Sequence, residues 1–183
     1  MGNSLTDDLR GATTWSIVLS VLIMIAGFLA IALPLIAGIA VTLIVGWMLI
    51  FTGVLHIVFA FRAGQTRMAV WQVLLGLVYG FIGVYILMNP VAGLAGLTFA
   101  IAVYLFVEAV LELALGIQLR PAPGTGWLIF DSIITFILAV MIWSTWPSSA
   151  AWVVGVLVGI SMLFSGMTRL MLTLAARRIV APA

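Results

Sequence analysis

The sequence predicts an all-α membrane protein with six transmembrane helices, and three observations support this. Of the 183 residues, 66% are hydrophobic and 7% are charged, a balance that is typical of integral membrane proteins. Six apolar runs are each about 20 residues or longer, which is the length that crosses a hydrocarbon core about 30 Å thick. A pattern of Trp, Gly and Pro also recurs along the chain, and a fixed period indicates a repeat architecture.

The repeat is clearest in residues 71–120. Its Trp71, Gly83 and Pro90 align with Trp15, Gly27 and Pro34 earlier in the chain and with Trp127, Ala139 and Pro147 later, at shifts of 56 or 57 residues. Each copy contains two apolar segments separated by a proline turn. The sequence therefore predicts three helical-hairpin repeats, at 15–62, 71–120 and 127–174.

The expected helices follow the apolar runs, and unbroken runs favour helix because backbone groups in lipid must be satisfied within the segment. The helices are expected at 15–35, 38–60, 69–88, 92–117, 127–146 and 150–174. A polar lead at 1–14 and a tail at 175–183 lie outside this transmembrane domain, 15–174. The lead has mixed charge and precedes an apolar run of about 20 residues, so we expect a retained first span and no cleaved signal.

Arginine sets the expected orientation. Six of the seven arginines lie in the lead, the second and fourth connections and the tail: Arg10, Arg62, Arg67, Arg120, Arg177 and Arg178. The three proline turns carry no charge. Cytoplasmic loops are enriched in arginine, so the even connections and both termini are expected in the cytoplasm. The repeats are then parallel, which predicts an approximate threefold arrangement about the membrane normal. An open row of hairpins is the alternative.

Small residues indicate where helices approach one another, because helix association in lipid depends on close backbone contact. Gly76, Gly80 and Gly83 form one such face. Small residues also recur at equivalent positions of the repeat, as Gly46, Ala102 and Gly159 and as Gly53, Ala109 and Gly166. Tryptophans at the ends of the spans predict interfacial belts, with Trp15, Trp71 and Trp127 on the inner side and Trp143, Trp146 and Trp152 on the outer side.

Ionisable residues within the spans are the candidate site. Aligned on the proline turns, His56, Glu112 and Arg169 occupy equivalent positions, and Thr52, Glu108 and Ser165 are equivalent one turn earlier. Residues four apart share one face of a helix, so a closed bundle would bring these pairs together. Asp131 lies at a similar depth in the fifth helix, which predicts an ion pair of Arg169 with Asp131 or with Glu112.

Three interpretations of this polar cluster stay open. Charged groups inside a membrane cost about 2.5–3.5 kcal/mol at the centre of a span, so they pair structurally or mark a pathway for protons or solutes. Near the interface they also snorkel toward water. Structural pairing is the simpler explanation, and ligand or lipid recognition is a further alternative.

Enzymatic chemistry is not expected. The chain has one His and no Cys, whereas a zinc site needs three or four suitable ligands. No Gly-x-Ser-x-Gly elbow is present, and without any Lys the chain lacks a phosphate-binding loop of the usual kind. Scattered arginines give no nucleic-acid-binding face. We therefore predict no catalytic residue, cofactor or metal, and the lipid bilayer and a second copy of the chain as partners.

Three copies of a Trp start, a Gly or Ala in mid-helix, a proline turn and a Gly-containing return helix resemble the HdeD family of bacterial acid-resistance membrane proteins. The resemblance covers about residues 12–175. It implies a non-enzymatic inner-membrane protein, built from a short repeated domain of unknown function, that contributes to acid or general stress tolerance. It supplies no site residues.

Two other functions stay open beside this one. The first is a small channel or transporter for protons, weak acids or a small solute. The second is a structural or oligomerisation scaffold. The proline turns hold no Asp, Glu, His, Lys or Arg, so a response to acid would depend on His56 and the pair Glu108 and Glu112.

Overall fold

The computed structural model describes the backbone of residues 2–62, 66–119 and 125–180, and the side chains within 15–62, 66–119 and 125–175. All regular structure in these ranges is helical. The elements are α1 (Gly2–Ala32), α2 (Pro34–Ala60), α3 (Thr66–Met88), α4 (Pro90–Gln118), α5 (Thr125–Ser144), the short 3₁₀ helix η1 (Ser148–Ala151) and α6 (Val153–Val180). Six of them are long and apolar enough to cross a membrane, which confirms the predicted fold class.

Apart from the two termini, the helix ends lie within four residues of the predicted ones, and the largest difference is at α2, which begins at Pro34 and not at residue 38. The sequence marks a first span from residue 15, yet α1 begins at Gly2 and includes the polar lead. Likewise α6 continues to Val180 beyond the predicted end of its span. Hydropathy detects only the part of a helix that lies in lipid, so the polar extensions of both helices carry no signal in the apolar pattern.

Two of the proline turns are very tight. A single residue, Leu33, separates α1 from α2, and a single residue, Asn89, separates α3 from α4. Proline is well tolerated at the first position of a helix, where no backbone N–H is needed, and Pro34 and Pro90 begin α2 and α4. The third turn is longer and contains η1. The additional residue that changes the repeat spacing from 56 to 57 lies before η1, between Ala139 and Pro147.

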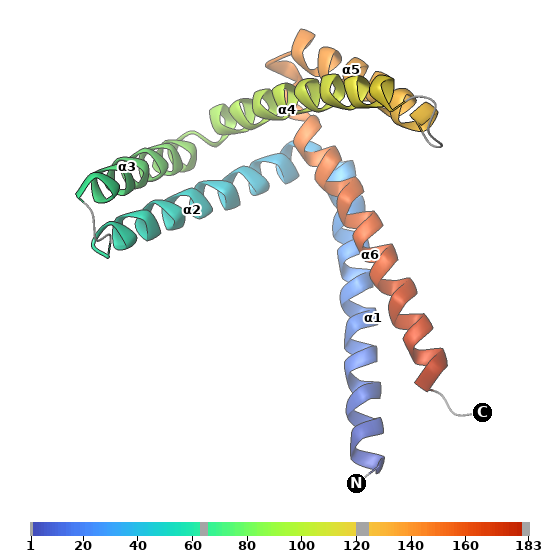
Figure 1. The fold of residues 1–183 in the computed structure, drawn as a ribbon. Helices are drawn as coiled ribbons and strands as arrows, with labels where there is room; N and C mark the ends of the chain where they lie inside the picture. The colour runs from blue at the N-terminus through green and yellow to red at the C-terminus, as the bar shows by residue number, and fades with distance from the viewer. Residues whose placement is uncertain (1, 63–65, 120–124, 181–183) are drawn as a thin grey trace. The chain divides into compact units, whose positions relative to one another are not determined.

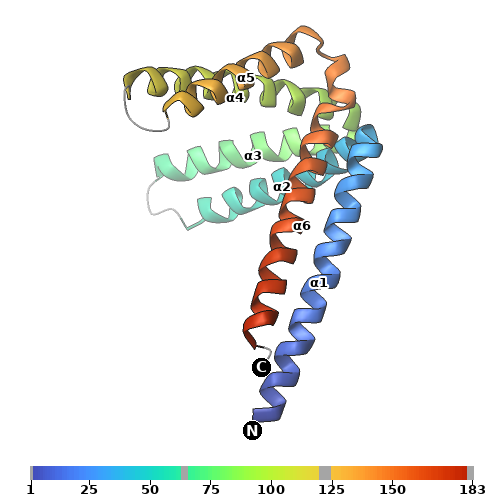
Figure 2. The ribbon, with the colours of Figure 1, turned by 90° about the vertical axis from the view of Figure 1, so that its right-hand side faces the viewer.

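The chain forms two compact units. The first contains α1, the first turn of α2, and α6 from Gly155 onward. In it α1 and α6 lie side by side and antiparallel (Figures 1 and 2). A Cβ atom placed on Gly27 would lie 2.8 Å from the carbonyl oxygen of Gly159, and one on Gly166 would lie 3.0 Å from that of Ser20. The two backbones are therefore in direct contact.

The second unit runs from Gly38 to Val154. It contains two antiparallel helix pairs, α2 with α3 and α4 with α5 (Figures 1 and 2). In the first pair, Gly53 contacts Gly76 and Gly46 contacts Gly83. In the second pair, Ala102 and Ile142 form a buried cluster with Val153, and Gly116 contacts Ile129.

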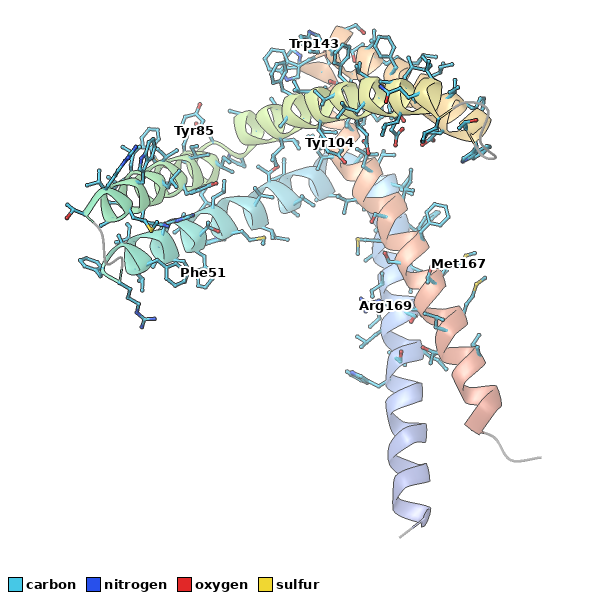
Figure 3. The ribbon with its side chains drawn as sticks, viewed as in Figure 1. Phe51, Tyr85, Tyr104, Trp143, Met167 and Arg169 are labelled. Carbon is cyan, nitrogen blue, oxygen red and sulfur yellow. The ribbon has the colours of Figure 1, made fainter. Side chains whose placement is uncertain are left out.

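Buried small residues spaced seven apart line every helix pair. They are Ser20 and Gly27 in α1, Gly46 and Gly53 in α2, Gly76 and Gly83 in α3, Ala102 and Ala109 in α4, Ser132 and Ala139 in α5, and Gly159 and Gly166 in α6. A seven-residue period keeps one seam in contact when two helices wind around each other with a left-handed twist. We call these contacts the small-residue seams. Most large apolar side chains, such as Phe51 on α2, are exposed and project away from the partner helix (Figure 3), as expected for a surface in lipid.

The seams do not join the two helices of one sequence repeat. They join α2 to α3 and α4 to α5, across the arginine-bearing connections, and α6 to α1. The first and last helices thus form the third pair. Its seam residues occupy the same positions of the repeat as the seam residues of the other two pairs. The threefold arrangement of all six helices extends over both units and stays a prediction.

Candidate functional site

His56 lies at the seam between α2 and α3 and forms a hydrogen bond with Gln72, which is not among the predicted site residues. Its Nδ1 donates a hydrogen bond of 2.5 Å to Oε1 of Gln72. The ring also stacks on Tyr79, with centroids 5.4 Å apart and planes 5° from parallel. Because an amide oxygen only accepts, Nδ1 is the donor in this hydrogen bond. His56 is half-buried. Its hydrogen bond with Gln72 and its stacking on Tyr79, both on α3, fix the orientation of the ring.

The contact between His56 and Gln72 can be measured directly. In a double-mutant cycle of His56→Leu and Gln72→Leu, we expect a coupling of about 0.6 kcal/mol, and no more than about 1.7 kcal/mol, as for other hydrogen bonds between membrane helices. The free energy of unfolding in detergent micelles is the measured quantity. A matched cycle replaces Gln72→Leu by Phe81→Leu, an exposed residue of α3, and should give coupling near zero. Equal coupling in both cycles contradicts the contact.

The two glutamates of α4 have different surroundings. Glu108 accepts a hydrogen bond of 3.2 Å from the hydroxyl of Tyr104, one turn earlier on the same helix (Figure 3). In contrast, Oε2 of Glu112 is buried and has no hydrogen-bond partner among the described residues. The sequence predicts that Glu108 and Glu112 form one polar pair on α4, and in the structure Glu108 has a hydrogen bond whereas the buried Oε2 atom of Glu112 has none among the described residues.

Arg169 lies on α6 (Figure 3), and its backbone oxygen takes part in a short chain of hydroxyl hydrogen bonds. Thr173 donates to the backbone oxygen of Arg169 at 2.8 Å, and the hydroxyls of Ser16 and Thr173 are 2.9 Å apart. Since the Thr173 proton is already used, Ser16 is the donor in the second bond. These bonds join α1 to α6 through Ser16, the repeat equivalent of Gln72, and Thr173, which lies one turn after Arg169, the repeat equivalent of His56.

The remaining predicted site residues are placed within their own helices. Thr52 is half-buried and donates to the backbone oxygen of Met48 at 2.8 Å. Asp131 and Ser165 are exposed on α5 and α6. The predicted ring of His56, Glu112 and Arg169 and the predicted ion pairs of Arg169 both involve residues of the two units, and they stay predictions.

The residues missed by sequence reasoning are Gln72, Tyr79, Tyr104, Ser16 and Thr173. Ser16 and Gln72 are 56 residues apart and each faces an even helix, so the repeat itself was a usable signal. The third copy has Leu128 at this position, so the polar residue is not repeated in all three copies.

The opposite end of the second unit holds aromatic and hydroxyl side chains. Trp143 and Trp146 pack edge-on against Phe99, and Nε1 of Trp146 donates to the backbone oxygen of Ala95 at 3.0 Å. A groove of about 380 Å³ lies beside them, lined by Met141, Ser144, Thr145, Ser148, Ser149 and Trp152. In the part of the chain that the structure describes, no three His, Asp or Glu side chains gather closely enough to hold a metal ion.

Comparison with known proteins is consistent with the repeat. The family described as a short repeat of unknown function (DUF308) matches the chain twice, over residues 18–88 and 76–144. Each match covers a proline turn and a following pair of helices that share a small-residue seam. No curated protein and no solved structure matches the chain.

Proposed function

Since this chain belongs to the membrane family defined by the short repeat of unknown function (DUF308), we propose that it acts, without catalysis, in acid or general stress tolerance. In this proposal the protein lies in a bacterial inner membrane with both termini in the cytoplasm. The resemblance to acid-resistance membrane proteins of the HdeD type suggests the role. The position of the titratable side chains supports it.

The titratable residues of the spans lie toward one end of the helices. His56, Glu108, Glu112 and Asp131 are all nearer to the arginine-bearing connections than to the proline turns. The single histidine is bound to the neighbouring helix through Gln72. A proton gained at His56 would add charge at a packed helix seam, where it alters helix contacts more than at a free surface. This observation carries the proposal.

A transport role has less support. Outward of Thr52 and Glu108, the hydroxyl-bearing residues of α2 and α4 are Tyr104, which is bonded to Glu108, and two threonines, Thr42 in α2 and Thr98 in α4. Both are fully buried, and each donates its hydroxyl proton to its own helix, at 2.8 Å to Gly38 and 2.9 Å to Leu94. A hydroxyl bonded in this way satisfies its helix backbone and offers no free donor to a solute.

The test is survival of the host after an acid challenge, with the gene deleted and then restored. We expect deletion to lower survival and the wild-type gene to restore it. His56→Gln keeps an N–H donor toward Gln72 but cannot gain a proton, so it should fail to restore survival. Phe59→Leu, an exposed change on the same helix, should restore it. Undiminished survival of the deletion strain contradicts the stress role, and full rescue by His56→Gln contradicts the role of His56.

A further inference from the structure

The proline turn between α5 and α6 differs from the other two in its hydroxyl side chains. When the three copies are aligned on their prolines, the third copy has a hydroxyl at four positions where both other copies have apolar residues. The third copy has Ser144, Thr145, Ser148 and Ser149 there, the first has Ile31, Ala32, Leu35 and Ile36, and the second has Leu87, Met88, Val91 and Ala92. The repeat fold therefore forms without these hydroxyl groups, and their presence in the third turn needs a separate explanation.

These four residues line the groove of about 380 Å³ beside the turn, together with Met141 and Trp152. Small-molecule sites in proteins have volumes of about 300–1,000 Å³, so the groove is large enough to hold a ligand. One candidate span ends at Ser144 and the next begins at Ser148. The groove therefore lies where the hydrocarbon of the bilayer meets the headgroups.

Three of the four hydroxyl protons are used inside the turn. Ser144 and Thr145 both donate to the backbone oxygen of Met141, at 3.1 Å and 2.8 Å. The buried Ser149 donates to the backbone oxygen of Ile142 at 3.0 Å. A hydroxyl oxygen that has donated its proton still accepts through its lone pairs. Because Ser144 and Thr145 are exposed, they offer the groove acceptors and no donors.

Two donors in the groove are left for a ligand. The hydroxyl of Ser148 and the indole N–H of Trp152 have no hydrogen-bond partner within residues 15–62, 66–119 and 125–175, and both side chains are exposed. The neighbouring Trp146 differs, since its Nε1 is bonded to Ala95. The groove thus fits a ligand that brings several N–H or O–H donors and at least one acceptor.

The charge of the lining selects among lipid headgroups. None of the six lining residues is ionisable, so an anionic headgroup would find no cation there, whereas a zwitterionic headgroup brings both charges. The ammonium of an ethanolamine headgroup has three N–H donors for hydroxyl oxygens, and a Trp ring attracts a cation. Its phosphate oxygens accept hydrogen bonds. A choline headgroup has no N–H and leaves the acceptors of the groove unused.

We propose that the groove binds the headgroup of a phospholipid with a primary ammonium, phosphatidylethanolamine, whose acyl chains stay in the bilayer. The ammonium donates to the hydroxyl oxygens of Ser144 and Thr145, and the phosphate accepts from Ser148 and Trp152. The proposal goes beyond the stress role and does not depend on it.

The experiment measures lipid binding to the full-length protein in detergent by native mass spectrometry. Phosphatidylethanolamine, phosphatidylcholine and phosphatidylglycerol with identical acyl chains are titrated separately. The compared quantity is the change in Kd that Ser148→Val causes for each lipid. This variant has the residue of the second copy, Val91, at an exposed position, so the fold should tolerate it, and circular dichroism verifies that it stays helical.

We expect Ser148→Val to weaken the binding of phosphatidylethanolamine about tenfold, the effect of losing one hydrogen bond to a charged group. Trp152→Phe, which keeps the ring and removes the N–H, should weaken it by a similar factor. The binding of the other two lipids should stay unchanged in both variants. Ser161→Ala, an exposed serine of α6 outside the groove, is the matched control and should leave all three lipids unaffected.

Three results would overturn the proposal. The first is unchanged binding of phosphatidylethanolamine in both Ser148→Val and Trp152→Phe, which would place the lipid elsewhere. The second is an equal loss for phosphatidylcholine or phosphatidylglycerol in these variants, which would show that the groove does not recognise the primary ammonium. The third is displacement of the lipid by an equal concentration of free phosphoethanolamine, which would make the ligand a soluble molecule.

Discussion

Gly83→Ala is expected to destabilise the pair of α2 and α3 by about 1–3 kcal/mol, the usual cost of forcing extra volume into a packed core. The new Cβ would lie 2.7 Å from the carbonyl oxygen of Gly46 and 2.9 Å from the backbone nitrogen of Ile50. Backbone atoms cannot rotate away as a side chain does, so the two helices must separate along their seam. The measured quantity is the free energy of unfolding in detergent.

Gly80→Ala is the matched control for this change. It lies on the same helix, and a Cβ on Gly80 would meet nothing within 4 Å. Because alanine favours helix over glycine by about 0.8–1.0 kcal/mol, Gly80→Ala is expected to be neutral or stabilising. If Gly83→Ala and Gly80→Ala change stability equally, the contact of Gly83 with α2 is wrong.

A disulfide between the first and last helices is the second large effect that we expect. The chain has no Cys, so introduced cysteines report without background. The hydroxyls of Ser16 and Thr173 are 2.9 Å apart across α1 and α6. In Ser16→Cys/Thr173→Cys, mild oxidation in membranes should therefore form an intramolecular crosslink in nearly every chain. Altered gel mobility, reversed by a reductant, detects it.

The control pair combines Ser16→Cys with Ser161→Cys. Ser161 lies on α6 at a distance of 12 residues from Thr173, which is about 18 Å along the helix axis and beyond the reach of a disulfide. It should give no intramolecular crosslink. Equal crosslinking of the two pairs, or none in either, contradicts the pairing of α1 with α6.

The six spans could be predicted from sequence because their signal is local. Apolar length and the prolines at Pro34 and Pro90 place the helices without knowledge of their neighbours. The choice of packing partners is not local. A proline turn and an arginine-bearing connection are both short, so each predicts adjacent helices, and only the contacts of Gly53 with Gly76 and of Gly159 with Gly27 show which seams form.

The candidate site could be predicted in part for the same reason. Ionisable residues within apolar runs can be identified from sequence alone, and this identifies His56, Glu108 and Glu112 as candidate site residues. Their partners depend on the register between helices. Gln72 and Tyr104 are ordinary polar residues until the structure places one beside His56 and the other beside Glu108.

The contact between α1 and α6 has a consequence for synthesis in the cell. The ribosome makes α1 first and α6 last, whereas α2 with α3 and α4 with α5 can associate as soon as the second member of each pair emerges. Ser20 and Gly27 of α1 therefore stay open to lipid until translation is nearly complete. A chain truncated before α6 leaves them permanently unmatched, so membrane proteases that recognise unassembled helices can distinguish a finished molecule from an incomplete one.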